Sequence, residues 1–255
     1  MGIEIREAVV VKRGAPGALR IEAEKMARAR DIGLASGLFR VPEIHECDDA
    51  RGVLVMERIP GLVGFRRATF GRAEARSMLD RVGRSLAQVH QHLVLPEALR
   101  RPLPAALDQP GSAAFLHGDF SAENVCVASG GQLVLIDWQI SPRCGTDENW
   151  GTRYFDVCWF VGNLFRKPAW EYLRGLPPGE AAGLFMDGYR RDGGSIEPTA
   201  FVTYHRAFFD FRIGTQEKGL DLARKALLHH GFKQWEKFIE EFPARGGGDG
   251  LPRFA

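Results

Sequence analysis

LHGDFSAENV, at residues 116–125, is followed by an apolar run that ends in IDW at residues 136–138. Asn124 stands five residues after Asp119, and Asp137 closes the apolar run as a second acid. This order of acid, amide and acid suits metal-dependent phosphoryl transfer. That reaction needs a carboxylate beside the attacking hydroxyl and oxygen ligands for a Mg²⁺ ion.

Each of the three polar side chains suits a separate task. Asp119 provides the carboxylate, and Asp137 a metal ligand. Asn124 offers a neutral amide oxygen, which binds a metal without adding negative charge beside the phosphates. The alternative is an ordinary loop and a surface acid, because isolated HxD or IDW triplets occur by chance. The combination of these spacings favours phosphotransfer.

The segment between the two metal ligands carries the pattern of a β-hairpin. Residues 125–127 and 132–136 alternate around Ser129-Gly130-Gly131, which is a turn signal. A hairpin here brings Asn124 and Asp137 to the same end, so that both can hold one ion.

These motifs resemble those of the aminoglycoside phosphotransferase and choline kinase-like family, a branch of the protein-kinase-like fold. The resemblance implies that Asp119 is the catalytic base, that Asn124 and Asp137 bind Mg²⁺, and that His117 supports the catalytic loop. It also implies an α+β, bilobal fold with a small β-rich N-terminal lobe and a larger, mainly helical C-terminal lobe. Protein kinases carry HRD and DFG at these places, so the HGD and IDW found here favour the small-molecule branch.

The N-terminal segment extends the resemblance. Residues 8–11 form an apolar run that ends in Lys12, like the kinase strand whose lysine binds the α and β phosphates. A helical segment then runs from Leu19 towards Ile32. The family implies a glutamate there that pairs with the lysine, for which Glu22 fits best and Glu24 competes. A solvated lysine and a solvated glutamate are the alternative for either residue alone.

Two strands are predicted at residues 41–44 and 52–61. The second resembles the family's strand that leads into the hinge between the lobes, where backbone groups hydrogen-bond adenine. The resemblance implies that the carbonyl of Glu57 and the N–H of Ile59 make these contacts. A plain edge strand that ends in Pro-Gly is the alternative.

The chain departs from the family before Lys12. The family carries two strands and a phosphate-covering glycine-rich loop there, but only eleven residues precede Lys12 and Gly2 is the only glycine among them. We therefore expect a reduced nucleotide-binding lobe at residues 1–60, a catalytic and acceptor-binding lobe at 61–243 and a mobile tail at 244–255. The departure leaves open a pseudokinase, which would bind nucleotide or regulate without transfer.

The rest of the chain reads as helical. Residues 72–92 carry the apolar stripe of an amphipathic helix, and three more helices are predicted at 179–191, 198–211 and 216–242. Their aromatic side chains are expected in the core. Asp156 opens another apolar helix. The resemblance implies that it supports the catalytic loop, and a carboxylate at a helix N-terminus is favourable in any case.

Composition excludes several classes of function. The 34 basic and 32 acidic residues give a net charge of +2, which argues against a nucleic-acid partner. No apolar run approaches the roughly 20 residues of a membrane span. The four cysteines are scattered without a CxxC pair, so neither a zinc site nor a disulfide framework is indicated, and a cytoplasmic location is expected.

The sequence therefore predicts an ATP- and Mg²⁺-dependent kinase that phosphorylates a hydroxyl of a small molecule, such as an aminoglycoside-like compound, an amino alcohol or a related metabolite. GTP in place of ATP, and transfer of AMP in place of phosphate, stay open. The segment at residues 141–153 contains both signs of charge and Trp150. Its acids and Trp150 suit an ammonium group, its arginines suit an anion, and the sequence does not choose.

Overall fold

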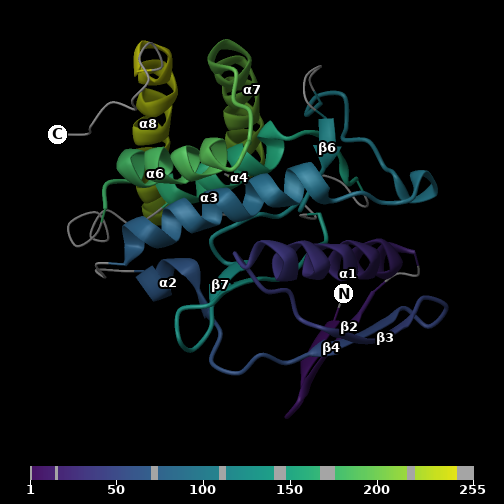
Figure 1. Cartoon of the computed structure of the whole chain (residues 1–255). Coiled ribbons are helices and arrows are strands. Elements are labelled where there is room, and N and C mark those ends of the chain that lie inside the picture. Colours follow the sequence, from purple (N-terminus) through teal and green to yellow (C-terminus); the bar gives the residue numbers. More distant parts are fainter. Residues whose placement is uncertain are drawn as a thin grey trace. The chain divides into compact units, whose positions relative to one another are not determined.

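The structure is a computed structural model that describes residues 2–14, 17–69, 74–108, 113–140, 148–166, 176–216 and 222–245. The chain separates into two compact units. The first comprises residues 1–68 and 88–153, and the second comprises residues 69–87 and 154–255 (Figure 1). The lobe boundaries at residues 60 and 243 and the mobile tail stay predictions, and residues 246–255 lie outside the described part.

A four-stranded antiparallel sheet forms the N-terminal part of the first unit. Its strands are β1 (Gly2–Ile5), β2 (Val9–Arg13), β3 (Ile44–Asp48) and β4 (Val53–Glu57), in the order β1-β2-β4-β3. The predicted strand at 41–44 is wrong in its bounds, because β3 begins at Ile44. Pro42 has no N–H for a sheet ladder, which is a reason for the strand to begin after it.

Helix α1 (Ala18–Ser36) packs against β3 and β4 of this sheet. Leu19, Met26 and Ala29 are buried on its inner face, and two charged residues of the same helix, Glu22 and Lys25, are buried as well. The helix ends at Gly37, whose φ of 66° is the left-handed conformation that glycine tolerates at a helix C-terminus.

The predicted hairpin is present. It consists of β7 (Val125–Val127) and β8 (Leu133–Leu135), and β5 (Val63–Gly64) pairs with β7. Gly130 and Gly131 make the turn with φ values of 84° and 81°. The Ile136 N–H donates to the Asn124 carbonyl at 3.0 Å, so the ladder sets Asn124 beside the start of the IDW segment.

Shorter elements complete the first unit. Strands β6 (Ala113–Phe115) and β9 (Trp150–Thr152) pair antiparallel, on either side of the loop and hairpin in sequence. The remaining elements are α2 (Phe65–Thr69), the last of whose residues falls in the second unit, and the 3₁₀ turn η1 (Glu97–Leu99).

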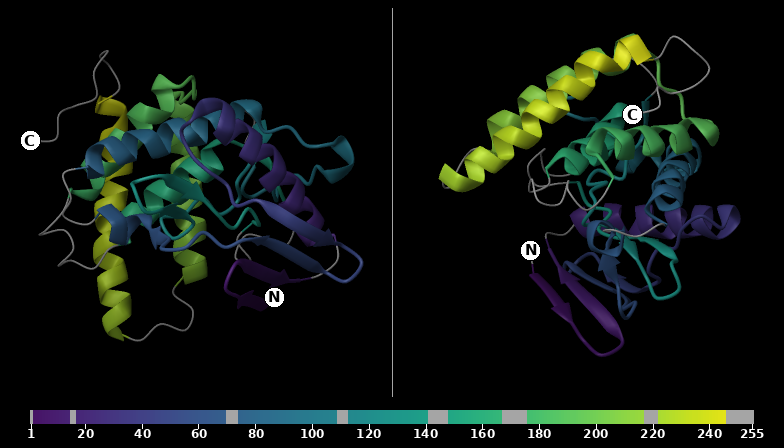
Figure 2. Two further views of the ribbon diagram at one scale, coloured as in Figure 1. Left: turned by 60° about the horizontal axis from the view of Figure 1, so that its bottom comes forward. Right: turned by 90° about the vertical axis from the view of Figure 1, so that its left-hand side faces the viewer.

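The second unit is helical in its described part. It contains α4 (Tyr154–Phe165), α6 (Pro178–Arg191), α7 (Pro198–Gln216), α8 (Leu222–Arg245) and the part of α3 (Ala75–His92) up to Ala87. Helices α7 and α8 run side by side (Figure 2). The predicted boundary between them is wrong: Gln216 ends α7, five residues beyond the predicted end at 211. Arg212 continues the buried face, with its guanidinium 3.9 Å from the ring centre of Trp159.

Aromatic side chains fill the core of this unit, as predicted. All twelve residues of α4 are buried. Of the predicted core aromatics, Phe211 is half-buried and the others are buried, namely Phe185, Tyr189, Phe201, Tyr204, Phe208 and Phe209. No helix in the described ranges is both long and apolar enough to cross a membrane.

A buried histidine makes the stability of this unit depend on pH. Trp235 Nε1 donates to His205 Nε2 at 2.6 Å, and burial lowers the pKa of His205 from 6.5 to about 3. The unfolded chain therefore takes up a proton near pH 6.5 while the folded chain does not. This contribution to stability is present above pH 6.5 and is lost as the pH falls towards 3, at about 1.4 kcal/mol per pH unit.

We expect the free energy of unfolding to fall less steeply between pH 6.5 and pH 4 when His205 is replaced by glutamine. Urea denaturation at several pH values measures this slope. His45→Gln, at an exposed position of β3, is the control and is expected to keep the wild-type slope. Parallel curves for wild type and His205→Gln would contradict the assignment.

Candidate functional site

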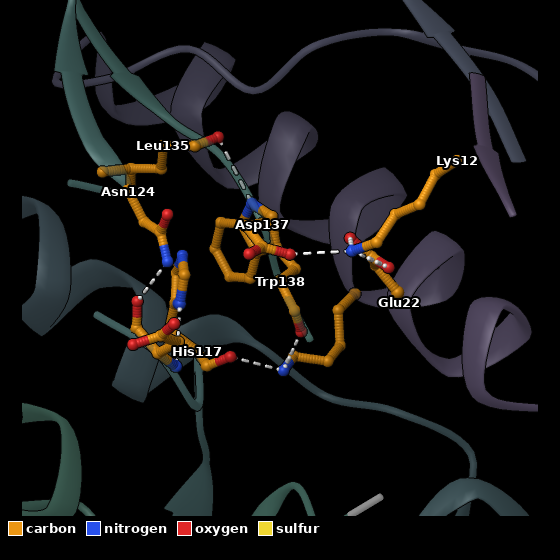
Figure 3. A network of polar contacts seen from close by, with 9 residues as sticks. Lys12, Glu22, His117, Asn124, Leu135, Asp137 and Trp138 are labelled. Atoms are coloured by element: carbon orange, nitrogen blue, oxygen red, sulfur yellow. Dashed lines mark hydrogen bonds and ion pairs between the residues drawn. The ribbon is translucent and has the colours of Figure 1, made fainter. Parts of the chain in front are cut away.

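The site centres on the ammonium group of Lys12, a residue of β2 in the first unit. Its Nζ lies 2.8 Å from the carboxylate of Glu22 and 2.7 Å from Oδ1 of Asp137 (Figure 3). Lys12 is 3% exposed and Glu22 is 1% exposed. The competing Glu24 instead pairs with Arg28 at the surface of α1, so Glu22 is the partner of Lys12.

Two carboxylates flank the ammonium of Lys12, and the ammonium of Lys25 also acts on Glu22. Burial alone would lower the pKa of Lys12, but the carboxylates of Glu22 and Asp137 outweigh it and raise that pKa. Burial raises the pKa of Glu22, and the ammonium of Lys12 counteracts this. Asp137 is the more exposed of the two acids, so its carboxylate is the one accessible to a further cation.

The loop that holds Asp119 is braced by its own polar groups. The Asp119 carbonyl accepts hydrogen bonds from the Ser121 N–H at 2.7 Å and from Asn124 Nδ2 at 3.0 Å. The Asp119 N–H donates to His117 Nδ1 at 3.4 Å. Gly118 has a φ of 93°, and a Cβ there would lie 2.9 Å from the Cα of Ile140. The loop therefore requires glycine between His117 and Asp119.

His117 lies buried between aromatic rings. Its ring centre is 5.4 Å from that of Phe120 and 4.4 Å from that of Trp138. This position connects the HGD motif to the IDW motif by direct packing, which is compatible with the supporting role that the family resemblance implies.

The donor atoms of Asn124 and Asp137 fit a Mg²⁺ ion. The amide nitrogen of Asn124 is used for the Asp119 carbonyl, so its oxygen is the atom left for a ligand (Figure 3). One oxygen of Asp137 contacts Lys12, and the second is left for a metal. Mg²⁺ commonly takes one or two protein oxygens together with phosphate oxygens and water, so two such residues suffice.

Asp137 has an unusual backbone. Its φ is 56°, and it is the one non-glycine residue of the described ranges with a positive φ. Such a conformation costs about 1–3 kcal/mol and persists at functional sites, where the surrounding contacts enforce it. One of these contacts is the indole N–H of Trp138, which donates to the Leu135 carbonyl at 3.3 Å (Figure 3).

A cavity of about 460 Å³ joins the predicted nucleotide-binding residues. Its polar end is formed by Lys12, Glu22, Asn124 and Asp137, and its hinge side by Met56, Glu57, Arg58 and Ile59. The apolar part is lined by Ile3, Ile5, Val10, Pro42, Leu62 and Ile136. Residues that are far apart in the sequence thus meet around one space of the size that small ligands occupy.

The residues predicted to form the hinge are held by ion pairs and backbone contacts. The carboxylate of Glu57 pairs with Arg40, and the Glu57 N–H donates to the Glu43 carbonyl at 2.7 Å. Arg58 donates to the carbonyls of Arg6 and Glu7 at 3.1 and 3.2 Å. Arg58 is therefore tied to the turn between β1 and β2.

Three predicted site residues, His117, Asp119 and Asp156, do not line the cavity. Asp119 is half-buried in the loop that ends at Asn124. Asp156 belongs to the second unit, where it is buried in the first turn of α4. Its support of the catalytic loop stays a prediction.

Sequence reasoning missed the residues that cover and brace the site. Ile3 and Ile5 line the cavity although they are 61% and 66% exposed, and the alternation of β1 was the available signal. Lys25 is 1% exposed and its Nζ contacts the backbone of both motifs. The sequence feature that could have identified Lys25 was its position one helical turn after Glu22.

A cation of the protein itself already contacts Trp150, the residue suggested to bind an ammonium group of the acceptor. The guanidinium of Arg100 lies 4.1 Å from the centre of the Trp150 ring, and Phe115 packs on the same residue at 4.7 Å. One face of Trp150 therefore already holds a cation. Of the other charged candidates in this segment, Arg143 and Asp147 lie outside the described residues, whereas Glu148 and Arg153 lie within them.

Comparison with known proteins establishes the fold. No protein-family model matches the sequence, and the search of curated proteins finds no match. Solved structures match over most of the chain. A choline/ethanolamine kinase family protein from Mesorhizobium loti aligns with 94% of this chain and 86% of its own, at 17% identity and a TM-score of 0.55.

Two other small-molecule kinases show the same likeness. An aminoglycoside-3'-phosphotransferase of type VIII aligns with 80% of this chain and 84% of its own, at 18% identity and a TM-score of 0.52. A glucosamine kinase in complex with glucosamine, ADP and inorganic phosphate aligns with 94% and 78%, at 15% identity and a TM-score of 0.53. The predicted protein-kinase-like α+β fold, of the aminoglycoside phosphotransferase and choline kinase type, is confirmed.

Proposed function

We propose that this protein is a small-molecule kinase, which transfers the γ-phosphoryl group of ATP to a hydroxyl of its acceptor with the help of Mg²⁺. The observation that carries the proposal is the ion-paired cluster of Lys12, Glu22 and Asp137 at the polar end of a cavity. The likeness to kinases of choline, glucosamine and aminoglycosides supports it, and so does the ADP in the glucosamine kinase.

In this proposal each group of site residues has a separate role. The apolar part of the cavity receives the nucleotide base, next to the backbone of Glu57 and Ile59. Lys12, held by Glu22, binds the phosphates. Asp119 orients the acceptor hydroxyl and accepts its proton as the phosphoryl group departs. When bound by Asn124 and Asp137, Mg²⁺ neutralises charge on the phosphates.

The acceptor is a small molecule with a hydroxyl group, of the aminoglycoside-like, amino-alcohol or related metabolite classes. GTP is the alternative donor, because backbone contacts at a hinge leave the choice of base to details of the cavity. Nucleic acid and membrane are not partners in this proposal, which places the enzyme in the cytoplasm.

A pseudokinase is the second candidate, and one observation favours it. Strand β1 returns directly into β2 through the short turn at residues 6–8, with Ile5 opposite Val10. A chain folded in this way has no phosphate-covering loop between these two strands. Nucleotide would then bind without transfer.

Thermal unfolding with ATP or GTP, each with and without Mg²⁺, tests the nucleotide site first. A ligand that binds only the folded state raises its stability, by about 2.7 kcal/mol at a hundredfold excess over its dissociation constant. Mass spectrometry of a panel of hydroxyl compounds then distinguishes a phosphate adduct from an AMP adduct. Binding with no product across the panel supports the pseudokinase, and no binding at millimolar nucleotide refutes both candidates.

We expect Ile5→Ser to weaken ATP binding about fivefold, because serine lacks the apolar side chain that Ile5 offers to a bound base. Burying an aliphatic side chain completely contributes about 1.5–3 kcal/mol, and partial cover about half of this. Titration of ATP binding measures the change. Leu34→Ser is the matched control, since Leu34 is 70% exposed on α1 and does not line the cavity. Equal dissociation constants for wild type and Ile5→Ser would contradict the placement of the base.

A further inference from the structure

Lys25 connects three parts of the site. Its Nζ donates to the His117 carbonyl at 2.6 Å and to the Trp138 carbonyl at 2.5 Å. Dashed lines in Figure 3 mark these two hydrogen bonds, which reach the carbonyl oxygens of His117 and Trp138. His117 lies two residues before Asp119, and Trp138 directly follows Asp137. One ammonium group therefore holds the backbone beside both acids.

The chemistry of this contact favours a fixed geometry. An ammonium has three donors and no acceptor, and at 1% exposure it requires polar partners because burying a charge without them is costly. The two carbonyls supply such partners. They are oriented by the backbone of the two motifs, so a movement of either motif away from α1 breaks a charge-assisted hydrogen bond.

The helix that carries Lys25 also carries Glu22, one turn earlier. Glu22 holds Lys12, and Lys12 contacts Asp137. One turn of α1 thus reaches Asp137 twice, through the side chain of Lys12 and through the backbone at Trp138. The positive φ of Asp137 makes the direction of its carboxylate depend on such backbone contacts.

We propose that Lys25 is a positioning residue that sets the separation between the base Asp119 and the metal ligand Asp137. This inference rests on the proposed function for its catalytic consequence. Lys25 does not itself line the cavity, and its hydrogen bonds to His117 and Trp138 go to backbone carbonyls. It acts through the backbone of the two motifs, so its loss misplaces both acids together.

The test uses Lys25→Met, which keeps the length of the side chain and removes its donors. We expect kcat to fall about 100-fold, which is the scale of a misplacement of about 1 Å in a catalytic group. The ATP dissociation constant in EDTA is expected to change less than about threefold, because Lys12 and Glu22 stay in place. The Mg²⁺ concentration for half-maximal turnover is expected to rise.

Two further variants make the result specific. Lys25→Gln retains an amide donor for one carbonyl and is expected to recover part of kcat. Arg28→Met removes another cation of α1, which is paired with Glu24 at the surface, and is expected to behave as wild type. An unchanged kcat in folded Lys25→Met overturns the proposal. Equal losses of kcat and of ATP affinity overturn it as well, and so does a failure of both Lys25 variants to fold.

Hydrogen exchange provides a readout that needs neither nucleotide nor acceptor. In Lys25→Met, the amides of residues 114–128 and 133–140 are expected to exchange faster, while those of β3, β4 and α6 keep their wild-type rates. If wild type transfers no phosphate but these two segments loosen, the proposed function fails and the positioning role stands. If wild type is active and these segments keep their rates, the positioning role fails alone.

Discussion

Asp119→Asn is expected to lower kcat by about 10³-fold while the dissociation constant of ATP stays within about threefold of wild type. A positioned base contributes roughly 10²–10⁴-fold to such a reaction, and asparagine cannot accept the proton. The loop itself is expected to keep its shape. The hydrogen bonds that brace it use the carbonyl and the N–H of Asp119, which the substitution retains.

Steady-state kinetics at saturating nucleotide, together with direct ATP titration, separates the two effects. Glu123→Gln is the matched control, because Glu123 belongs to the same loop, is exposed and pairs loosely with Arg66 at 3.4 Å. The control is expected to keep kcat within about twofold of wild type. A kcat for Asp119→Asn within tenfold of wild type would show that another group accepts the proton.

Asp137→Asn is expected to abolish the Mg²⁺-dependent part of ATP binding and to lower kcat by about 10³-fold, the scale of several kcal/mol of charge stabilisation. Asparagine is chosen because it tolerates the positive φ found at this position, whereas alanine would add backbone strain. The substitution also removes one of the two carboxylates beside Lys12. ATP binding in EDTA is therefore expected to persist.

Thermal shifts with ATP, with and without Mg²⁺, measure this loss directly, and turnover against Mg²⁺ concentration measures its catalytic effect. Asp31→Asn, which removes an exposed carboxylate of α1, is the control and is expected to keep the Mg²⁺-dependent shift. If Mg²⁺-dependent stabilisation persists in Asp137→Asn, Asp137 is not a metal ligand, and the assignment of Asn124 as a ligand is weakened as well.

The sequence predicted the local elements of the site well, because their signals are local. The two turn glycines fixed the hairpin, and the apolar stripe of residues 72–92 predicted α3 to its last residue, His92. Predictions were less accurate where tertiary contacts decide the boundary. This applies to the helix boundary at 211–216, because the buried Arg212 packs on Trp159 of α4. The strand at 41–44 was misplaced for a local reason, since Pro42 has no N–H for a sheet ladder.

The spacing of HGD, Asn124 and IDW by itself predicted the candidate acids of this protein, and the resemblance of these motifs to a known family predicted the type of fold. Only the tertiary structure decided which groups meet them. Lys12 and Asp137 are separated by 125 positions and lie 2.7 Å apart, and Lys25 contacts two motifs across 92 and 113 positions. A sequence pattern records the spacing within a segment, whereas these contacts exist because packing of α1 and the sheet brings separate segments together.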